Sequence, residues 1–177
     1  MKTKTEATVD DLYRVPDDGK AEIINGELVL MSPTGGVPGR AAGEIYVSLR
    51  DYERSVGGGY AFPDNVGFIV NLPHRRSFSP DAAFYTGELR GGLFLEGAPI
   101  FAVEVRSAED YGPAAEKLMA LKRADYFAAG ALVVWDVTFF ARKLCEPFVQ
   151  ATRPSQSSLA ATRLLTLSRR CQAGRWL

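Results

Sequence analysis

The sequence contains very little of two residues on which many enzyme sites are built, histidine and cysteine. His74 is the only histidine, and no G-x-S-x-G stretch that would present a nucleophilic serine occurs. A serine or cysteine acyl-transfer site is therefore disfavoured. Cys145 and Cys171 are the only cysteines, and they form no C-x-x-C pair. Their number and spacing argue against a disulfide framework and against a structural zinc site.

Long apolar runs are also missing. No stretch approaches the roughly 18 to 20 uninterrupted apolar residues of a membrane helix, and residues 1–10 lack the apolar core of a secretory signal. We therefore expect a soluble, cytoplasmic protein with no membrane partner. At 177 residues and 46% apolar composition, the chain is long enough for one domain with a full core and too short to suggest two.

An excess of charge of one sign is absent overall, since 21 Lys and Arg balance 21 Asp and Glu. The charges are unevenly spread: residues 1–141 hold 14 Lys and Arg against 20 Asp and Glu, and residues 142–177 hold 7 against 1. A basic tail of this kind binds nucleic acid by neutralising phosphates, but such tails are as often simply solvated. Charge alone leaves nucleic-acid binding open.

Turn residues and periodicity predict an alternation of strands and helices in the first half of the chain. Asn25-Gly26 joins two apolar runs, and it is the strongest short hairpin signal because both turn positions tolerate positive φ. The predicted elements are a helical turn over 10–13, hairpin strands over 20–24 and 27–31, a helix over 37–56, a strand over 60–72, a strand opening at Ala82 and a Gly-rich loop over 87–99.

The stretch from Ile100 to Val137 has the clearest pattern. A short apolar run over 100–105 is followed by a helix over 114–129 and by a second apolar run over 131–137. Strand, helix and strand in this order imply two parallel neighbouring strands joined by a right-handed crossover. We therefore expect an α/β fold.

Glu104, inside the first of these apolar runs, is the starting point for a candidate site. A carboxylate among β-branched neighbours is costly to desolvate unless it is paired or bound to a metal. Asp81 is the other acid at the mouth of an apolar strand, and we prefer it to Asp64, which precedes an apparent loop. Lys117 and Lys122 lie on the following helix, from which a lysine can fold back toward Glu104.

Two carboxylates and a backbone carbonyl suit Mg²⁺ or Mn²⁺, hard cations that prefer oxygen ligands. Such an ion lowers the pKa of bound water and neutralises phosphate charge, while a nearby lysine orients or deprotonates the water or balances charge. This combination favours phosphodiester hydrolysis. Glu44, next to Ile45 on the predicted helix over 37–56, is a further candidate, either as a buried first acid or as a boundary residue.

Several short motifs, taken in order, resemble a known family. Pro80-Asp81 followed by Glu104-Val105-Arg106-Ser107 resembles the PD-(D/E)XK signature of restriction-endonuclease-like nucleases, with Arg106 at the position of the signature lysine. Within that superfamily the chain resembles the bacterial Uma-type endonuclease family over residues 12–137. The other shared motifs are Glu22-Ile23-Ile24-Asn25-Gly26-Glu27-Leu28-Val29, Met31-Ser32-Pro33-Thr34, Lys122 with Tyr126 and Gly130, and Trp135-Asp136.

This resemblance implies a restriction-endonuclease-like fold, a central mixed β-sheet flanked by helices and preceded by an N-terminal β-hairpin. It implies a metal-dependent nuclease acting on DNA, with RNA as the alternative substrate. Asp81 and Glu104 are implied as metal ligands, and the Val105 carbonyl as a third. Lys122 is implied as the relocated catalytic lysine, with Lys117 in reserve. Because duplex cleavage often uses two-fold related sites, we also expect a homodimer.

Two other interpretations fit the same residues. The first is a non-catalytic nucleic-acid-binding or regulatory domain on the same fold. In the second, Asp81 and Glu104 are structural acids paired with Arg75, Arg76 or Arg106. In each case residues 1–137 form the single domain, and residues 138–177 are an atypical basic segment that departs from the resemblance. We hypothesise that a change of reading frame produced this segment.

Overall fold

A five-stranded mixed β-sheet is the centre of the fold. The computed structural model describes residues 6–16, 19–138 and 145–149. The strands lie in the order β10, β9, β8, β6, β3, with β8 and β9 parallel and the other neighbouring pairs antiparallel. They are β3 (Tyr60–Phe62), β6 (Ala82–Tyr85), β8 (Phe101–Val105), β9 (Val133–Val137) and β10 (Cys145–Val149). The predicted central mixed sheet is confirmed.

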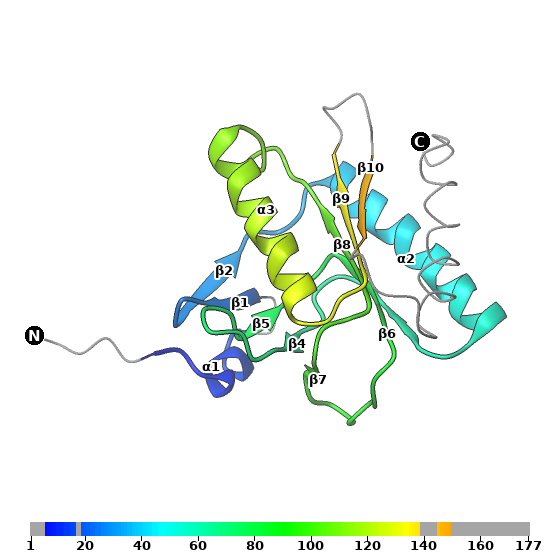
Figure 1. Cartoon of the computed structure of the whole chain (residues 1–177), viewed down its shortest axis with the longest axis horizontal. Coiled ribbons are helices and arrows are strands. Elements are labelled where there is room, and N and C mark those ends of the chain that lie inside the picture. The colour runs from blue at the N-terminus through cyan, green and yellow to red at the C-terminus, as the bar shows by residue number, and fades with distance from the viewer. Residues whose placement is uncertain (1–5, 17–18, 139–144, 150–177) are drawn as a thin grey trace, which may run out of the picture.

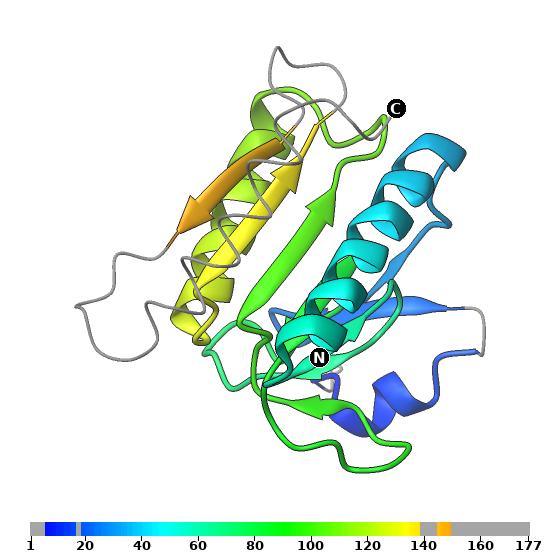
Figure 2. The same ribbon diagram turned by 90° about the vertical axis from the view of Figure 1, so that its right-hand side faces the viewer.

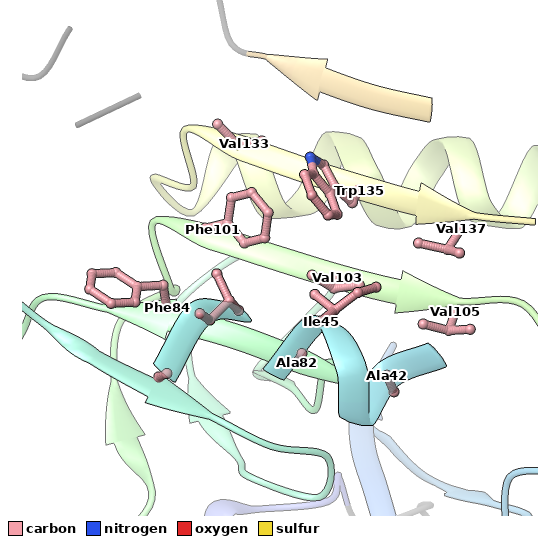
Figure 3. Packing of buried hydrophobic residues seen from close by; sticks show 12 residues of the cluster. Ala42, Ile45, Ala82, Phe84, Phe101, Val103, Val105, Val133, Trp135 and Val137 are labelled. Atoms are coloured by element: carbon pink, nitrogen blue, oxygen red, sulfur yellow. The ribbon is translucent and has the colours of Figure 1, made fainter. Parts of the chain in front are cut away.

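Two helices cover the opposite faces of this sheet. α2 (Gly36–Val56) and α3 (Pro113–Ala128) lie on its two sides (Figure 1, Figure 2). Because side chains alternate along a strand, Val103 faces α2, where Ile45 packs over it (Figure 3). The next residue, Glu104, faces α3. Neither these helices nor any other helix in the described residues is long and apolar enough to cross a bilayer.

The chain from β8 to β9 forms the predicted strand, helix, strand unit. α3 begins at Pro113, whose missing N–H leaves no helical hydrogen bond unmade in the first turn. Gly130 follows the helix with a φ of 108°, a conformation that glycine adopts without steric cost. β9 then runs parallel to β8, with Asp136 opposite Glu104. The predicted parallel pair is confirmed.

An N-terminal β-hairpin lies on the α3 side of the central sheet (Figure 1). β1 (Lys20–Ile24) pairs antiparallel with β2 (Glu27–Met31), within the bounds predicted from the sequence. Asn25 and Gly26 have φ values of 51° and 71°, the left-handed region that a two-residue type I′ turn requires at both positions. The short helix α1 (Val9–Tyr13) precedes the hairpin.

The predicted strand over residues 60–72 is wrong as a single element. Its first part is β3, and its second part is β4 (Phe68–Ile69), which belongs to a separate three-stranded sheet of order β5, β4, β7. The chain bends between them because Pro63 has no N–H for a ladder and Asn65 has a φ of 65°. The other two strands of the small sheet are β5 (Ser77–Phe78) and β7 (Leu95–Glu96), and β7 lies within the predicted Gly-rich loop.

The small sheet joins the hairpin to the core. The backbone N–H of Arg76 donates to the carbonyl of Ile23 at 3.0 Å, and the Ile23 N–H donates to Oγ of Ser77 at 2.8 Å. These bonds fix β1 against the segment before β6. As a result, the side chains of Lys20 and Glu22 on β1 reach the same region of the central sheet as Asp81.

The C-terminal edge of the central sheet is β10, which pairs antiparallel with β9. Apart from Thr138 and the backbone of β10, the predicted basic segment over 138–177 lies outside the described residues. The reading-frame hypothesis and nucleic-acid binding by this segment therefore stay predictions.

Candidate active site

Three acidic side chains form a row across the α3 face of the central sheet. Glu104 on β8 lies opposite Asp136 on β9. Asp81 is the residue before β6, and the adjacent pairing of Ala82 with Val103 places it beside Glu104 on the other side. The exposed fractions of the whole residues are 8% for Asp81, 7% for Glu104 and 2% for Asp136. Buried carboxylates need partners, and the partners differ along the row.

Glu104 is held by two side chains of α3. The hydroxyl of Tyr126 donates to Oε1 at 2.6 Å, and the ammonium of Lys122 donates to Oε2 at 2.8 Å. Burial raises the pKa of Glu104 to about 7, because the attraction of Lys122 does not offset desolvation and the repulsion from Asp81 and Glu22. An additional cation near Glu104 would therefore favour its ionised form.

The ammonium of Lys122 lies between two carboxylates that come from distant parts of the chain. Its Nζ is 2.8 Å from Oε2 of Glu104 and 3.0 Å from Oε1 of Glu22. Burial acts to lower the pKa of Lys122, but the attraction of Glu104 and Glu22 outweighs it and the pKa is raised. Lys122 therefore keeps its proton at neutral pH. A lysine of this helix was expected to fold back toward Glu104, and Lys122 does so.

Glu22, on β1, extends this contact into a chain of buried ion pairs. Its Oε2 pairs with Arg75, whose Nε donates to Asp125 at 2.8 Å, and its Oε1 accepts the backbone N–H of Ser79 at 3.0 Å. Although burial acts to raise the pKa of Glu22, Lys122 and Arg75 lower it by more, and the pKa falls below its ordinary value. Glu22 is thus an ionised anchor for Lys122.

Asp81 is held by a backbone amide of β8 and by a lysine of the hairpin. The N–H of Val105 donates to Oδ2 at 2.7 Å, and Nζ of Lys20 donates to Oδ1 at 2.7 Å. The first bond fixes the carboxylate at the end of β8, beside Glu104. Val105, the predicted third metal ligand through its carbonyl, is the last residue of β8, and its side chain is buried on the α2 face.

Arg106, which stands where the signature has a lysine, is part of the scaffold. Its Nε and Nη2 donate to the two oxygens of Asp136 at 2.6 and 2.7 Å, and it also pairs with Glu116. Arg123 makes a further contact with Asp136. Two arginines therefore neutralise the third acid of the row. Arg106 is directed to Asp136 and not to Glu104.

The structural pairing considered from the sequence is wrong in its partners. Among the described residues, the ion pairs of Asp81 and Glu104 are made by Lys20 and Lys122, and none is made by Arg75, Arg76 or Arg106. Arg75 is directed instead to Glu22 and Asp125 because the small sheet places it beside β1.

Two of the predicted catalytic residues are not brought into this cluster by any hydrogen bond or ion pair among the described residues. Glu44 lies on α2, where it pairs with Arg40 at 2.7 Å. Lys117 is an exposed residue of α3. The catalytic roles assigned to them from the sequence stay predictions.

The cluster carries an excess of negative charge that a divalent cation would neutralise. Five carboxylates of the described contact network meet three Lys and Arg side chains, and His74 also contacts Asp125. With the carboxylates ionised and His74 neutral, an excess of two negative charges remains. The carboxylates are Glu22, Asp64, Asp81, Glu104 and Asp125, and the cations are Lys20, Arg75 and Lys122. By contrast, Asp136 and Glu116 are matched by Arg106 and Arg123.

The donor set at Asp81 and Glu104 fits Mg²⁺ or Mn²⁺, because carboxylate oxygens are the ligands that these ions prefer and because such ions keep several waters. Within the described part of the chain, no three Asp, Glu, His or Cys side chains are placed to hold an ion together. A backbone oxygen and waters would have to complete the coordination. Among the described residues, Lys20 is bonded to Asp81 and Lys122 is bonded to Glu104, so each of the two acids already contacts an ammonium group.

From the sequence, the role of Glu22 is left open, Lys20 is not selected, and Arg75 is considered only as a partner of Asp81 or Glu104. The sequence does contain a signal that places Lys20 and Glu22 together. Lys20 and Glu22 are two residues apart on one predicted strand, so strand alternation places both on one face. Arg75 gave no such signal for a contact with Glu22, because it lies between two predicted strands, after residue 72 and before Ala82.

Comparisons with known proteins show the family of the chain and a similar fold. A family model described as Uma2, putative restriction endonuclease, matches residues 9–172. A solved structure of a putative nuclease belonging to DUF820 from Anabaena variabilis ATCC 29413 has a similar fold, with a TM-score of 0.59 and 15% sequence identity. The similarity covers 85% of this chain and 90% of that chain. None of the curated proteins compared with the chain matches it.

Proposed function

The chain belongs to the Uma2 family of putative restriction endonucleases, and we propose that it is a metal-dependent nuclease that hydrolyses phosphodiester bonds of DNA. The observation that carries the proposal is the contact of Lys122 with Glu104 at 2.8 Å, on the strand next to Asp81. Two acids and an amine are the side chains that this chemistry needs, and they meet at the end of β8.

Each residue has a role that follows from its contacts. Asp81 and Glu104, with the carbonyl of Val105, would hold Mg²⁺ or Mn²⁺. When bound, such an ion lowers the pKa of a water molecule and neutralises charge on the phosphate. Tyr126 orients Glu104 through its 2.6 Å hydrogen bond. The Val105 N–H orients Asp81.

We assign Lys122 a charge-balancing role. In the metal-free protein Glu104 and Glu22 raise its pKa against the effect of burial, so the ammonium is protonated there at neutral pH. Its ammonium donates hydrogen bonds, and it balances negative charge that develops on a phosphate oxygen. Glu22, whose Oε1 lies 3.0 Å from Nζ, is its second ion-pair partner.

Family membership supports DNA as the substrate, and the same chemistry extends to RNA. Because a duplex has two strands of opposite direction, a two-fold symmetric dimer places one site on each strand. We therefore propose a homodimer acting in the cytoplasm. Light scattering of the purified protein tests the dimer, and cleavage assays with matched DNA and RNA substrates test the preference.

Cleavage of a supercoiled plasmid in Mg²⁺ or Mn²⁺ tests the proposed activity. We expect Asp81→Asn, Glu104→Gln and Lys122→Met each to lose at least about a hundredfold in rate, the size of effect seen when a group stabilising the transition state is removed. Arg54→Met is the control, because it removes a cation whose side chain is 70% exposed on α2, and its activity should equal wild type. Circular dichroism confirms that each variant is folded.

Equal cleavage by wild type and all variants would mean that a contaminant is responsible. The second candidate function is a non-catalytic nucleic-acid-binding or regulatory domain. The observation that favours it is that Arg106 is paired with Asp136 and Glu116. The position of the signature lysine therefore has no catalytic group. Such a domain would bind the plasmid without cleaving it, and its affinity would be the same with and without the divalent cation.

A further inference from the structure

Lys20 occupies an unusual position for a residue of an N-terminal hairpin. Its Nζ lies 2.7 Å from Oδ1 of Asp81 and 2.7 Å from Oδ1 of Asp64. The side chain of Lys20 is 14% exposed, that of Asp81 is 11% exposed, and that of Asp64, in the loop between β3 and β4, is 40% exposed. One ammonium therefore joins an inner carboxylate of the candidate site to an outer one at its rim.

Lys20 is held there by charge. Two carboxylates contact its Nζ at 2.7 Å each, and a lysine side chain ordinarily carries its positive charge at neutral pH. The ammonium also attracts the charge of Glu104. Its charge is felt by both of the acids that would hold a divalent cation.

A divalent cation and the Lys20 ammonium compete for the same oxygen. An ion bound to Asp81 would lie about 2.1 Å from its oxygen, and an ammonium hydrogen-bonded to that oxygen would then face a double positive charge across a few ångströms of poorly solvated space. Repulsion at that separation remains substantial even at an effective dielectric constant of about 20. The two cations are therefore mutually exclusive on Asp81 Oδ1.

We propose that Lys20 is the resident cation of this site in its metal-free form, and that a divalent cation binds in exchange for the contact between Lys20 and Asp81. The inference rests on the proposed metal-dependent function, and it adds a residue that sets metal affinity. Asp64 is the second anchor: once displaced, Lys20 keeps its bond to Asp64, and its flexible four-carbon chain permits the short movement.

Binding of Mn²⁺ alone to the full chain, measured by titration calorimetry, tests this exchange. We expect Lys20→Met to bind Mn²⁺ at least about tenfold more tightly than wild type, because the competing charge is gone. Lys20→Gln, which keeps a hydrogen-bond donor without the charge, should also bind more tightly. Arg54→Met, at a side chain on α2 that is 70% exposed, is the control and should bind as wild type does. Thermal unfolding gives a second readout, since Mn²⁺ should raise the Tm of Lys20→Met more than that of wild type.

The outcomes separate this inference from the proposed function. If wild type binds Mn²⁺ and both Lys20 variants bind it equally or more weakly, the exchange is overturned while the metal site stands. If none of the four proteins binds Mn²⁺, the metal-dependent function fails, and the exchange fails with it. Tighter binding by both Lys20 variants supports the exchange whether or not DNA is cleaved.

Discussion

Tyr126 donates its hydroxyl proton to Glu104 across 2.6 Å, while its ring stacks on Phe78 with centroids 3.9 Å apart. The ring belongs to the apolar core, and the hydroxyl belongs to the candidate site. The Tyr126 side chain therefore links the packing of α3 on the sheet to the orientation of the Glu104 carboxylate. Because the two roles reside in different parts of one side chain, mutation can separate them.

Tyr126→Phe is expected to keep the stacking and to lose the hydrogen bond. Because the acceptor is a buried carboxylate, the free energy of unfolding should fall by about 1.5 to 3 kcal/mol. Loss of a group that orients a metal-binding carboxylate typically costs 10- to 100-fold in metal affinity or activity, and we expect plasmid cleavage to fall by about that factor. Urea unfolding and the cleavage assay measure the two effects.

The matched control for this change is Tyr60→Phe, which removes the hydroxyl of a tyrosine that is 42% exposed. It should leave both measurements unchanged. If Tyr126→Phe were as stable and as active as wild type, the hydrogen bond to Glu104 would have no part in the site.

The residues that were found from the sequence share one property: each interrupts a local pattern. Glu104 is a lone acid in an apolar run, and Asp81 follows a proline at the mouth of a strand. The hairpin was predicted to the residue because Asn25-Gly26 fixes both the turn type and the register. Local sequence patterns predict a structural feature when the residues that determine it lie within a few positions of one another.

The partners of those acids could not be found in the same way. The contact of Lys20 with Asp81 spans 61 positions, and that of Arg75 with Glu22 spans 53. Such contacts depend on how the hairpin docks on the small sheet, and a single strand's pattern does not encode docking. The error in the strand over 60–72 has a related cause, because its alternation is shared by two strands of different sheets.

Glu22→Gln is expected to destabilise the protein in a pH-dependent manner. The charge of Glu22 is surrounded by Lys122 and Arg75, and removing one partner of a buried ion pair costs about 3 to 5 kcal/mol. The pKa of Glu22 is below its ordinary value of 4.5. Its contribution is therefore present above about pH 4.5 and is lost as the pH falls through the lowered value.

Denaturant unfolding of wild type and Glu22→Gln at a series of pH values checks this sign. The difference in unfolding free energy should be largest near pH 7 and should shrink toward zero in acid. Glu88→Gln, at a side chain that is 86% exposed, is the control and should show no difference at any pH. A difference that grew as the pH fell would contradict an ionised Glu22.

Arg106→Lys restores the lysine of the PD-(D/E)XK signature, yet we expect it to reduce stability without raising activity. Arg106 donates two parallel bonds to Asp136 and also pairs with Glu116, a geometry that a lysine ammonium does not reproduce. The unfolding free energy should fall by about 1.5 to 3 kcal/mol, while Arg90→Lys, at a side chain that is 66% exposed, should leave it unchanged. Plasmid cleavage should not exceed the wild-type rate, because Lys122 already supplies the ammonium beside Glu104. A gain of tenfold or more would show that a lysine at position 106 turns toward Glu104, and the assignment of the catalytic cation to Lys122 would then be wrong.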